Sequence, residues 1–507
     1  MEVVADGRKQ ISWERLATLA VVTIVTLTSI VLMLSCTSPE FSWDEADYVA
    51  SAANPWSVLW GASDYNRHGH GPMAIYLAKL GRELLPAHVA PVEYRLRFFG
   101  ALMGSLPVGF LYWTLRRSFA TSRAAALTGS GLLLFSVIRL EETNLVGPHH
   151  LMLACTLAIV GLGYEWRDRP TMRAAIALGA VMGFGALSMT YVIPAAICWL
   201  VAVSLAGRGW IGWDRTGLKI SWLIPVVLAT ASIIVLVLWP PGVLQHMVIS
   251  NFRWYLHYGH SRALVGDRIF DVTPRWAALY WLGRLDAPIL VFSILIILIA
   301  LEKAFRSSRL SSKHAYLAIC LTFFAGTALA AHMAGARNLL QFVGVLCLAT
   351  GALYDEALGQ EPKLIRFGAV AVVVLAALNL IWLARSSSYT PFLATDGYQV
   401  FLKENENRLR EKVKAVVSGT PTLNFYDQES GTPLAWDVSE MPWTTRADAP
   451  LSADVKYVLI PAYVYNDMPA EQPMRRVVAD HWKVVWSHKS RHAWELRLYE
   501  NPQASAP

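Results

Sequence analysis

Three carboxylates stand close together shortly after the first apolar segment, in the sequence Trp43-Asp-Glu-Ala-Asp-Tyr48. Asp44 and Glu45 are adjacent, and Asp47 follows them closely. A carboxylate covered by helices and a loop can act as a general base, and it can equally hold a metal ion or a sugar hydroxyl. Taken alone, these three residues could also be a hydrated acidic cap at a membrane surface, so their interpretation depends on the residues around them.

Further acidic and basic residues are expected on the same face of the membrane as these carboxylates. Acids and histidines at the boundary of an apolar segment are functional candidates, because burying them is costly. A cavity with carboxylates and several cations suits an anionic substrate whose phosphate becomes a leaving group. The residues of this kind are Glu141, Glu142, His149, His150, His68, His70, Arg253, His257, His260, Arg262 and Arg337.

The histidines and cysteines show no metal-binding pattern. Neither His68 with His70 nor His257 with His260 forms a helical His-x-x-x-His pair, and no cysteine lies beside them. A structural or phosphate-binding role is therefore favoured over a zinc site. The five cysteines all lie in or at the ends of apolar segments and fit no disulfide framework. No residue is assigned to a metal and the sequence indicates no particular cofactor, although a divalent cation remains compatible with it.

These residues are positioned by a chain whose composition is that of a membrane protein. Of 507 residues, 55% are hydrophobic and 16% are charged, with a mean hydropathy of +0.38; a soluble domain carries about 25% charged residues. A spanning helix needs about 20 apolar residues, and the apolar segments predict an all-α bundle of about eleven such helices. The segments are Leu16–Cys36, Phe98–Leu115, Ala124–Ile138, Leu145–Tyr164, two within Ala174–Ala206, Ile220–Gly242, Pro288–Leu301, Ala315–Ala336, Asn338–Tyr354 and Phe367–Ala384.

The basic residues predict the orientation of this bundle. Arginine and lysine gather before the first segment and after every even-numbered one, whereas the other short loops contain little beyond Arg139 and Arg337. Positively charged loops face the cytoplasm, so the N-terminus is predicted to be cytoplasmic, in a bacterial inner membrane. The net charge of +7 then reflects topology and not nucleic-acid binding. Arg139 is interpreted as a snorkelling interface residue, and Arg337 as a functional one.

The chain divides into a membrane part and a water-soluble part. Residues 1–385 hold the apolar segments and two long extracytoplasmic loops, 37–97 and 243–287. Residues 386–507 are predicted to form a small extracytoplasmic α/β domain that tunes acceptor binding and performs no chemistry itself. Its expected elements are an amphipathic helix over Gly397–Val417 and strands over Thr422–Tyr426, Tyr457–Ile460, Val477–Val485 and Ala493–Tyr499.

The order of the motifs resembles that of a known family. One apolar segment is followed by Phe41-Ser-Trp-Asp-Glu-Ala-Asp-Tyr48 and by a His-Gly-Pro-x-x-x-Tyr stretch, His70–Tyr76. The second long loop contains Pro274–Tyr280, and Arg337-Asn-Leu-Leu opens a late helix. These features are similar to those of the C superfamily of membrane glycosyltransferases, especially the protein O-mannosyltransferases and the bacterial lipid A aminoarabinose transferases. The resemblance extends loosely over Leu16–Ala384.

The resemblance implies transfer, with inversion, of a hexosyl or pentosyl group from a polyprenyl-phosphate donor to a glycan, lipid or protein acceptor outside the cytoplasm. Asp44 matches the proposed base, Glu45 supports it, and Arg337 matches the late arginine that holds the lipid phosphate. The other residues expected at the donor phosphate are Arg253, Arg262, His257 and His260. Those expected at the acceptor or the sugar are Asp47, Tyr65, His68, His70, Glu141, Glu142 and His149.

Two alternatives remain open. One is an oligosaccharide transferase or ligase that moves a larger lipid-linked glycan. The other is a flippase or transporter with no chemistry, for which paired repeats and broken helices meeting at the midplane are typical. This chain instead places its polar residues in two long loops on one side, which favours interfacial chemistry. It shows no nucleotide-binding motif.

Overall fold

A computed structural model describes most of the chain. The described residues are 2–35, 40–41, 43–56, 72–141, 146–166, 170–188, 192–207, 223–239, 263–265, 268–270, 274, 276–307, 310–330, 339–359, 362–385, 397–418, 420–430, 434–440, 453–462, 482–489 and 495–504.

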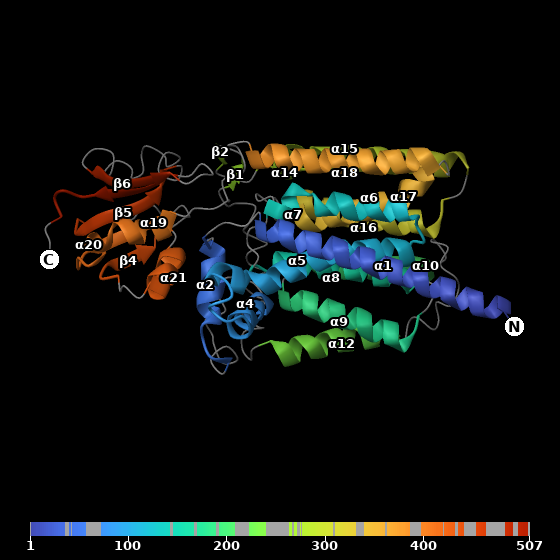
Figure 1. Ribbon diagram of the computed structural model, residues 1–507, viewed down its shortest axis with the longest axis horizontal. Coiled ribbons are helices and arrows are strands. Elements are labelled where there is room, and N and C mark those ends of the chain that lie inside the picture. The colour runs from blue at the N-terminus through green and yellow to red at the C-terminus, as the bar shows by residue number, and fades with distance from the viewer. Residues whose placement is uncertain are drawn as a thin grey trace.

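Long helices lie side by side along the long axis of the molecule (Figure 1). Within the described residues, a helix lies on every predicted apolar segment, and the predicted break of Ala174–Ala206 into two helices is confirmed. The helices are α1 (Glu2–Ser35), α5 (Val92–Arg117), α6 (Arg123–Leu134), α8 (His149–Glu165), α9 (Met172–Ser188), α10 (Ile193–Gly207), α12 (Leu223–Leu238), α15 (Ala287–Arg306), α16 (Ser312–Ala330), α17 (Leu340–Leu358) and α18 (Pro362–Arg385).

Three of these helices are long and apolar enough, within the described residues, to cross a membrane by themselves. They are Trp13–Ser35 of α1, Val92–Arg117 and Ala287–Arg306. Several others are apolar but shorter, so the number of spans stays a prediction.

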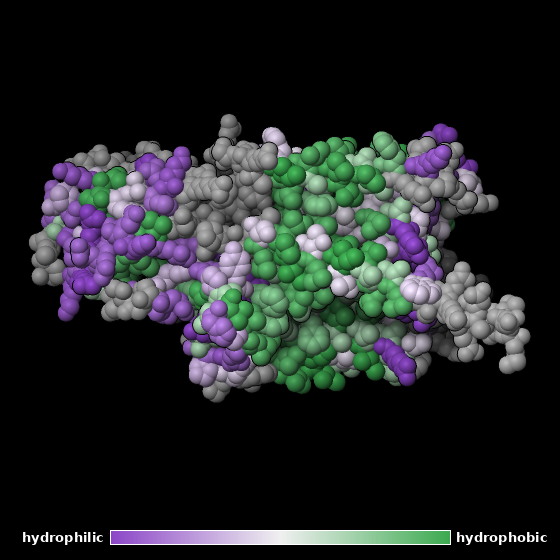
Figure 2. Space-filling model, viewed as in Figure 1, coloured by the Kyte–Doolittle hydropathy of each residue, from purple (hydrophilic) through white to green (hydrophobic). Residues whose placement is uncertain are grey.

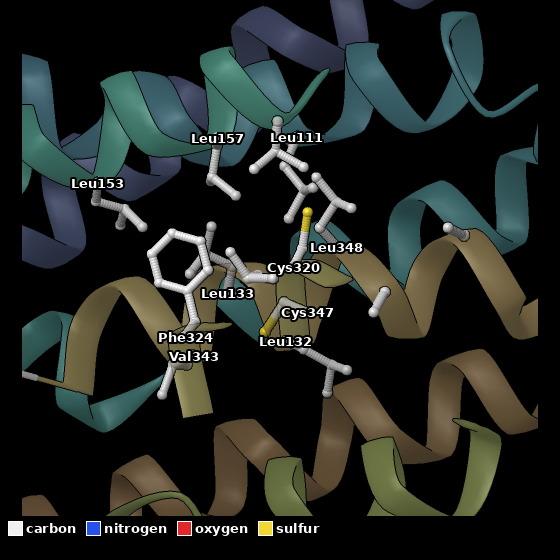
Figure 3. Close-up of a cluster of buried hydrophobic side chains, with 14 of the residues drawn as sticks. Leu111, Leu132, Leu133, Leu153, Leu157, Cys320, Phe324, Val343, Cys347 and Leu348 are labelled. Carbon is white, nitrogen blue, oxygen red and sulfur yellow. The ribbon is translucent and has the colours of Figure 1, made fainter. Parts of the chain in front are cut away.

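The surface of the bundle is apolar over its middle (Figure 2). Large apolar side chains stand exposed there: Leu19 is 62% exposed, Val291 65% and Trp382 65%. Soluble proteins rarely expose apolar area on this scale, whereas lipid tails accept it. The interior is equally apolar, since side chains from several helices point into one cluster (Figure 3) that contains Leu111, Leu132, Leu133, Leu153, Leu157, Cys320, Phe324, Val343, Cys347 and Leu348.

The two ends of the bundle differ. The basic flanks meet at the end that holds the N-terminus: Arg116 contacts Glu14 at 3.0 Å, and Lys303 donates to the Ala357 carbonyl at 2.7 Å. The opposite end holds the short elements α2 (Trp43–Ala52), α4 (Met73–Leu84), α7 (Val137–Glu141) and α14 (Ala277–Leu285), and the antiparallel pair β1 (Ala263–Val265) and β2 (Arg268–Phe270) belongs to the second long loop.

The described C-terminal residues form a mixed sheet with three helices. The strand order is β4-β3-β5-β7-β6, with β3 parallel to β4 and β5, and β7 antiparallel to β5 and β6. The elements are α19 (Gly397–Glu404), α20 (Glu406–Leu409), β3 (Lys414–Val417), α21 (Thr420–Ser430), β4 (Asp437–Glu440), β5 (Val455–Pro461), β6 (Lys483–Lys489) and β7 (Glu495–Glu500).

Two predictions for this region are wrong. Residues Thr422–Tyr426, predicted as a strand, lie within helix α21. Phe425 and Tyr426 are consecutive yet both are buried in one cluster, which a strand with alternating faces does not permit. The single helix predicted over Gly397–Val417 is instead α19, α20 and strand β3, because Val417 and Ala415 fill the core of the sheet.

Candidate active site

Helix α2 carries the carboxylates and is held at the end of the bundle. Ala46, Val49 and Ala52 recur every three residues and are fully buried, which gives the helix one apolar face. That face belongs to a cluster shared with Ala74, Ile75 and Ala78 of α4 and with Phe425 and Tyr426 of α21. Helix α2 is therefore packed between the membrane part and the C-terminal part of the chain (Figure 1).

Glu45 makes a buried, bidentate ion pair with Arg97 of α5. The Arg97 Nε donates to Glu45 Oε1 at 3.0 Å and its Nη2 donates to Oε2 at 2.7 Å. The side chains are 0% and 1% exposed. The backbone N–H of Val146, just before α8, also approaches Glu45 Oε1 at 3.5 Å. Because one carboxylate contacts α5 and the start of α8, it fixes the position of α2.

This geometry separates the roles of Glu45 and Asp44. Both oxygens of Glu45 accept hydrogen bonds from the Arg97 guanidinium, so Glu45 is an anchor for α2. Asp44 is the residue immediately before Glu45 in helix α2. The backbone of Asp44 is described, whereas its side chain lies outside the described part. The supporting role of Glu45 in catalysis stays a prediction.

Arg139 is not a snorkelling residue, contrary to the sequence interpretation. It is 0% exposed. Its Nε and Nη2 donate to the carbonyls of Leu133 and Leu134, each at 2.8 Å, and its Nη1 donates to Ser29 Oγ at 2.9 Å. These carbonyls belong to the last turn of helix α6, where the regular helical hydrogen bonds end, so the guanidinium helps to satisfy the end of that helix inside the bundle.

Asp286 supplies the matching contact on the other side of the break between α6 and α7. Its carboxylate accepts hydrogen bonds from Ser136 Oγ at 2.6 Å and from the Val137 backbone N–H at 2.7 Å. An anion at the first N–H groups of a helix is favourable. Arg139 and Asp286 together therefore fix α7, which ends at the predicted site residue Glu141.

The start of helix α8 carries two buried histidines. His149 is 3% exposed and His150 is 1% exposed. The ring of His150 lies against Gly104 of α5, where a Cβ would come within 2.8 Å of it. Only glycine permits this approach. The predicted role of His149 at the acceptor or sugar stays a prediction.

Most other predicted site residues lie outside the described part of the chain. These are Tyr65, His68, His70, Glu142, Arg253, His257, His260, Arg262 and Arg337. The backbones of Asp44, Asp47 and Glu141 are described but their side chains are not. Among the described residues, no group of three or more His, Cys, Asp or Glu side chains could hold a metal ion.

The helix that follows Arg337 in the sequence packs against α8. Helix α17 begins at Leu340, and in its first turn the Gln341 Nε2 donates to Thr156 Oγ1 of α8 at 2.8 Å. The start of α17 therefore lies beside the helix that begins with His149 and His150.

Sequence reasoning missed three residues that the structure brings to this site: Arg97, Glu93 and Glu40. Glu93 and Arg97 lie one turn apart at the start of helix α5, whose middle is apolar. Ionisable residues in such a helix are functional candidates by default, and this signal was available. The sequence instead predicts Arg97 as the last residue of the first long loop, 37–97.

Comparisons with known proteins agree with this fold. Residues 69–239 match the family model of dolichyl-phosphate-mannose-protein mannosyltransferases. No curated protein sequence gives a significant match. Among solved structures, the archaeal oligosaccharyltransferase AglB from Archaeoglobus fulgidus matches with a TM-score of 0.56 and 13% identity, over 98% of this chain and 75% of that one. ArnT from Cupriavidus metallidurans bound to undecaprenyl phosphate matches with a TM-score of 0.52 and 13% identity, over 98% and 99%.

The arabinofuranosyltransferase AftD from mycobacteria matches with a TM-score of 0.50 and 13% identity, over 96% of this chain and 40% of that one. All these structures are glycosyltransferases of the C superfamily. The chain therefore has the fold of this class of membrane glycosyltransferases, and the resemblance predicted from the sequence is confirmed. The matched residues 69–239 do not include Asp44, Glu45 or Arg337.

Proposed function

We propose that the protein transfers one sugar, with inversion, from a polyprenyl-phosphate donor to an acceptor at the extracytoplasmic surface of a bacterial inner membrane. The observation that carries this proposal is the buried Glu45–Arg97 pair, which fixes α2 and its Asp44 at the end of an apolar bundle. The tail of a polyprenyl donor lies among the lipid chains and its phosphate lies at the membrane surface. A base held at a fixed depth in the membrane can therefore lie beside the donor phosphate. The undecaprenyl phosphate bound in ArnT and the dolichol-phosphate bound in AglB support this donor class.

The proposed reaction is a single displacement. Asp44 accepts the proton of the acceptor hydroxyl, whose oxygen forms a bond to the anomeric carbon. The bond from that carbon to the phosphate oxygen breaks, and polyprenyl phosphate leaves with the electron pair. Glu45 keeps α2 in place through Arg97. Arg337, with Arg253, Arg262, His257 and His260, compensates the charge of the departing phosphate.

The decisive experiment supplies purified protein in nanodiscs with a panel of undecaprenyl- and decaprenyl-phosphate sugars. Release of polyprenyl phosphate, or sugar transfer to added envelope glycan, lipid or peptide, is the expected outcome. Use of oligosaccharide-diphosphate lipids alone would favour an oligosaccharide transferase. Movement of the donor across vesicles without bond cleavage would overturn the enzyme and indicate a flippase.

Arg337 is expected to control donor binding. Arg337→Ala should raise the donor KM strongly, and Arg337→Lys should rescue it only in part, because lysine lacks the bidentate fork. Donor titration of the purified variants measures this, with Arg306→Ala as a control at the opposite end of the bundle. An unchanged KM in Arg337→Ala would remove this residue from the site and shift attention to Arg253 and Arg262.

The predicted membrane topology places both the candidate site and the C-terminal part of the chain outside the cytoplasm. A reporter fused after Pro507 should be active only in the extracytoplasmic space, and one inserted at Gly359, between α17 and α18, only in the cytoplasm. Alkaline phosphatase and fluorescent-protein fusions measure the two sides. The opposite behaviour at either position would contradict the topology.

A further inference from the structure

The residues that precede Asp44 are held by the C-terminal part of the chain. Glu40 is 1% exposed, and its carboxylate accepts hydrogen bonds from the backbone N–H groups of Gln399, at 2.9 Å, and Tyr398, at 3.4 Å. Both groups belong to the first turn of α19, where a carboxylate is favoured by the helix dipole. A residue just before the carboxylate motif thus binds the N-terminal end of a helix far along the chain.

Phe41 extends the same contact. Its backbone N–H donates to Tyr426 Oη at 2.9 Å, and its ring meets the ring of Phe425 edge to face, with centroids 5.1 Å apart. Arg97, the partner of Glu45, places its guanidinium carbon 4.8 Å from the centre of the Phe41 ring and donates to the Glu40 carbonyl at 2.9 Å. One arginine therefore joins the α2 anchor to the C-terminal contact.

Two further features strengthen the junction. Gln399 Nε2 donates to Glu93 Oε1 at 3.0 Å, so α19 also contacts the start of α5. Burial, reinforced by the nearby carboxylates Glu93 and Glu40, raises the pKa of the Tyr426 phenol well above its ordinary value. A tyrosine phenol is uncharged at physiological pH in any case, so Tyr426 adds no charge to this buried site.

From these contacts we infer that the C-terminal part completes the active site, with Glu40, Phe41, Gln399 and Tyr426 acting as positioning residues for Asp44. The inference rests on the proposed function. It differs from the sequence prediction, in which the C-terminal domain only tunes acceptor binding. Catalytic groups must be held within about 0.5 Å of their productive position, and a short segment tethered at both ends meets this need. Here Glu45 holds one side of Asp44, and Glu40 with Phe41 holds the other.

The experiment compares Glu40→Ala and Tyr426→Phe with Glu404→Gln in the full-length protein. Glu404 lies at the other end of α19 and accepts a hydrogen bond from Trp486 Nε1 at 2.9 Å, inside the C-terminal part, so it is the matched control. Hydrogen exchange of peptides covering residues 43–52 reports the position of α2 without any substrate. Turnover with a polyprenyl-phosphate sugar reports kcat and the donor KM separately.

Losing a helix cap changes an equilibrium by about 2- to 30-fold, so Glu40→Ala should speed exchange in residues 43–52 by that factor. It should also lower kcat and leave the donor KM nearly unchanged. Tyr426→Phe removes one hydroxyl and should show the same pattern more weakly, which keeps the comparison valid should Glu40→Ala fail to fold. Unchanged exchange in folded Tyr426→Phe and Glu40→Ala would overturn the inference. Because exchange needs no substrate, this result is independent of whether the proposed reaction is correct.

Discussion

Asp44→Asn is expected to leave the protein folded and able to bind donor, but unable to transfer the sugar. Asparagine has nearly the same shape as aspartate and cannot accept the proton of the acceptor hydroxyl. The loss of one positioned general base lowers a rate by about 10²–10⁴. Single-turnover assays with a radiolabelled polyprenyl-phosphate sugar measure the rate of transfer, and the dependence on donor concentration gives the donor affinity.

Asp47→Asn is the matched control, since it makes the same chemical change on the same helix. It should reduce the rate far less, because Asp47 stands outside the Asp44-Glu45 pair. Near-normal turnover in Asp44→Asn, together with inactive Glu141→Gln, would place the base at the end of α7 and not on α2.

The helical part of the fold follows from local properties of the sequence. Among the described residues, each predicted apolar segment carries a helix of the bundle, although Ala124–Ile138 is divided between α6 and α7. The break between α9 and α10 was also predicted, because turn-forming residues around Ser188 and Pro194 interrupt an otherwise uncharged run. These signals involve neighbouring residues only, so one sequence is enough to read them.

The contacts that form the site are not local. Glu45 and Arg97 are 52 positions apart, and Phe41 and Tyr426 are 385 apart. Composition and periodicity identify each of these residues as polar or aromatic, but they do not identify its partner. For the same reason Arg139 could be noticed as an isolated cation in the sequence, whereas its role in ending helix α6 required the positions of Ser29 and Leu133.

Tertiary packing also overrode local preference in the C-terminal part. The alternation in Thr-Leu-Asn-Phe-Tyr is typical of a strand, yet these residues form helix α21. Phe425 and Tyr426 both reach the cluster beneath α2 only from a helix. Helix α21, which was predicted as a strand, therefore contributes side chains to the cluster that holds α2.

Arg97→Met should have the largest effect on stability, because it leaves Glu45 buried without its cation. Removing one partner of a buried ion pair costs about 3–5 kcal/mol, whereas the exposed pair of Arg410 with Glu406 is worth at most about 1 kcal/mol. Arg410→Met is therefore the matched control. Unfolding of the purified variants in detergent, followed by tryptophan fluorescence, measures the difference.

The double variant Glu45→Met/Arg97→Met should recover much of the lost stability, since two apolar side chains of similar size can fill the same space. It should nevertheless remain slow in transfer, because α2 has lost the directional contact that orients Asp44. If Arg97→Met is as stable as Arg410→Met, the Glu45–Arg97 pair does not anchor α2.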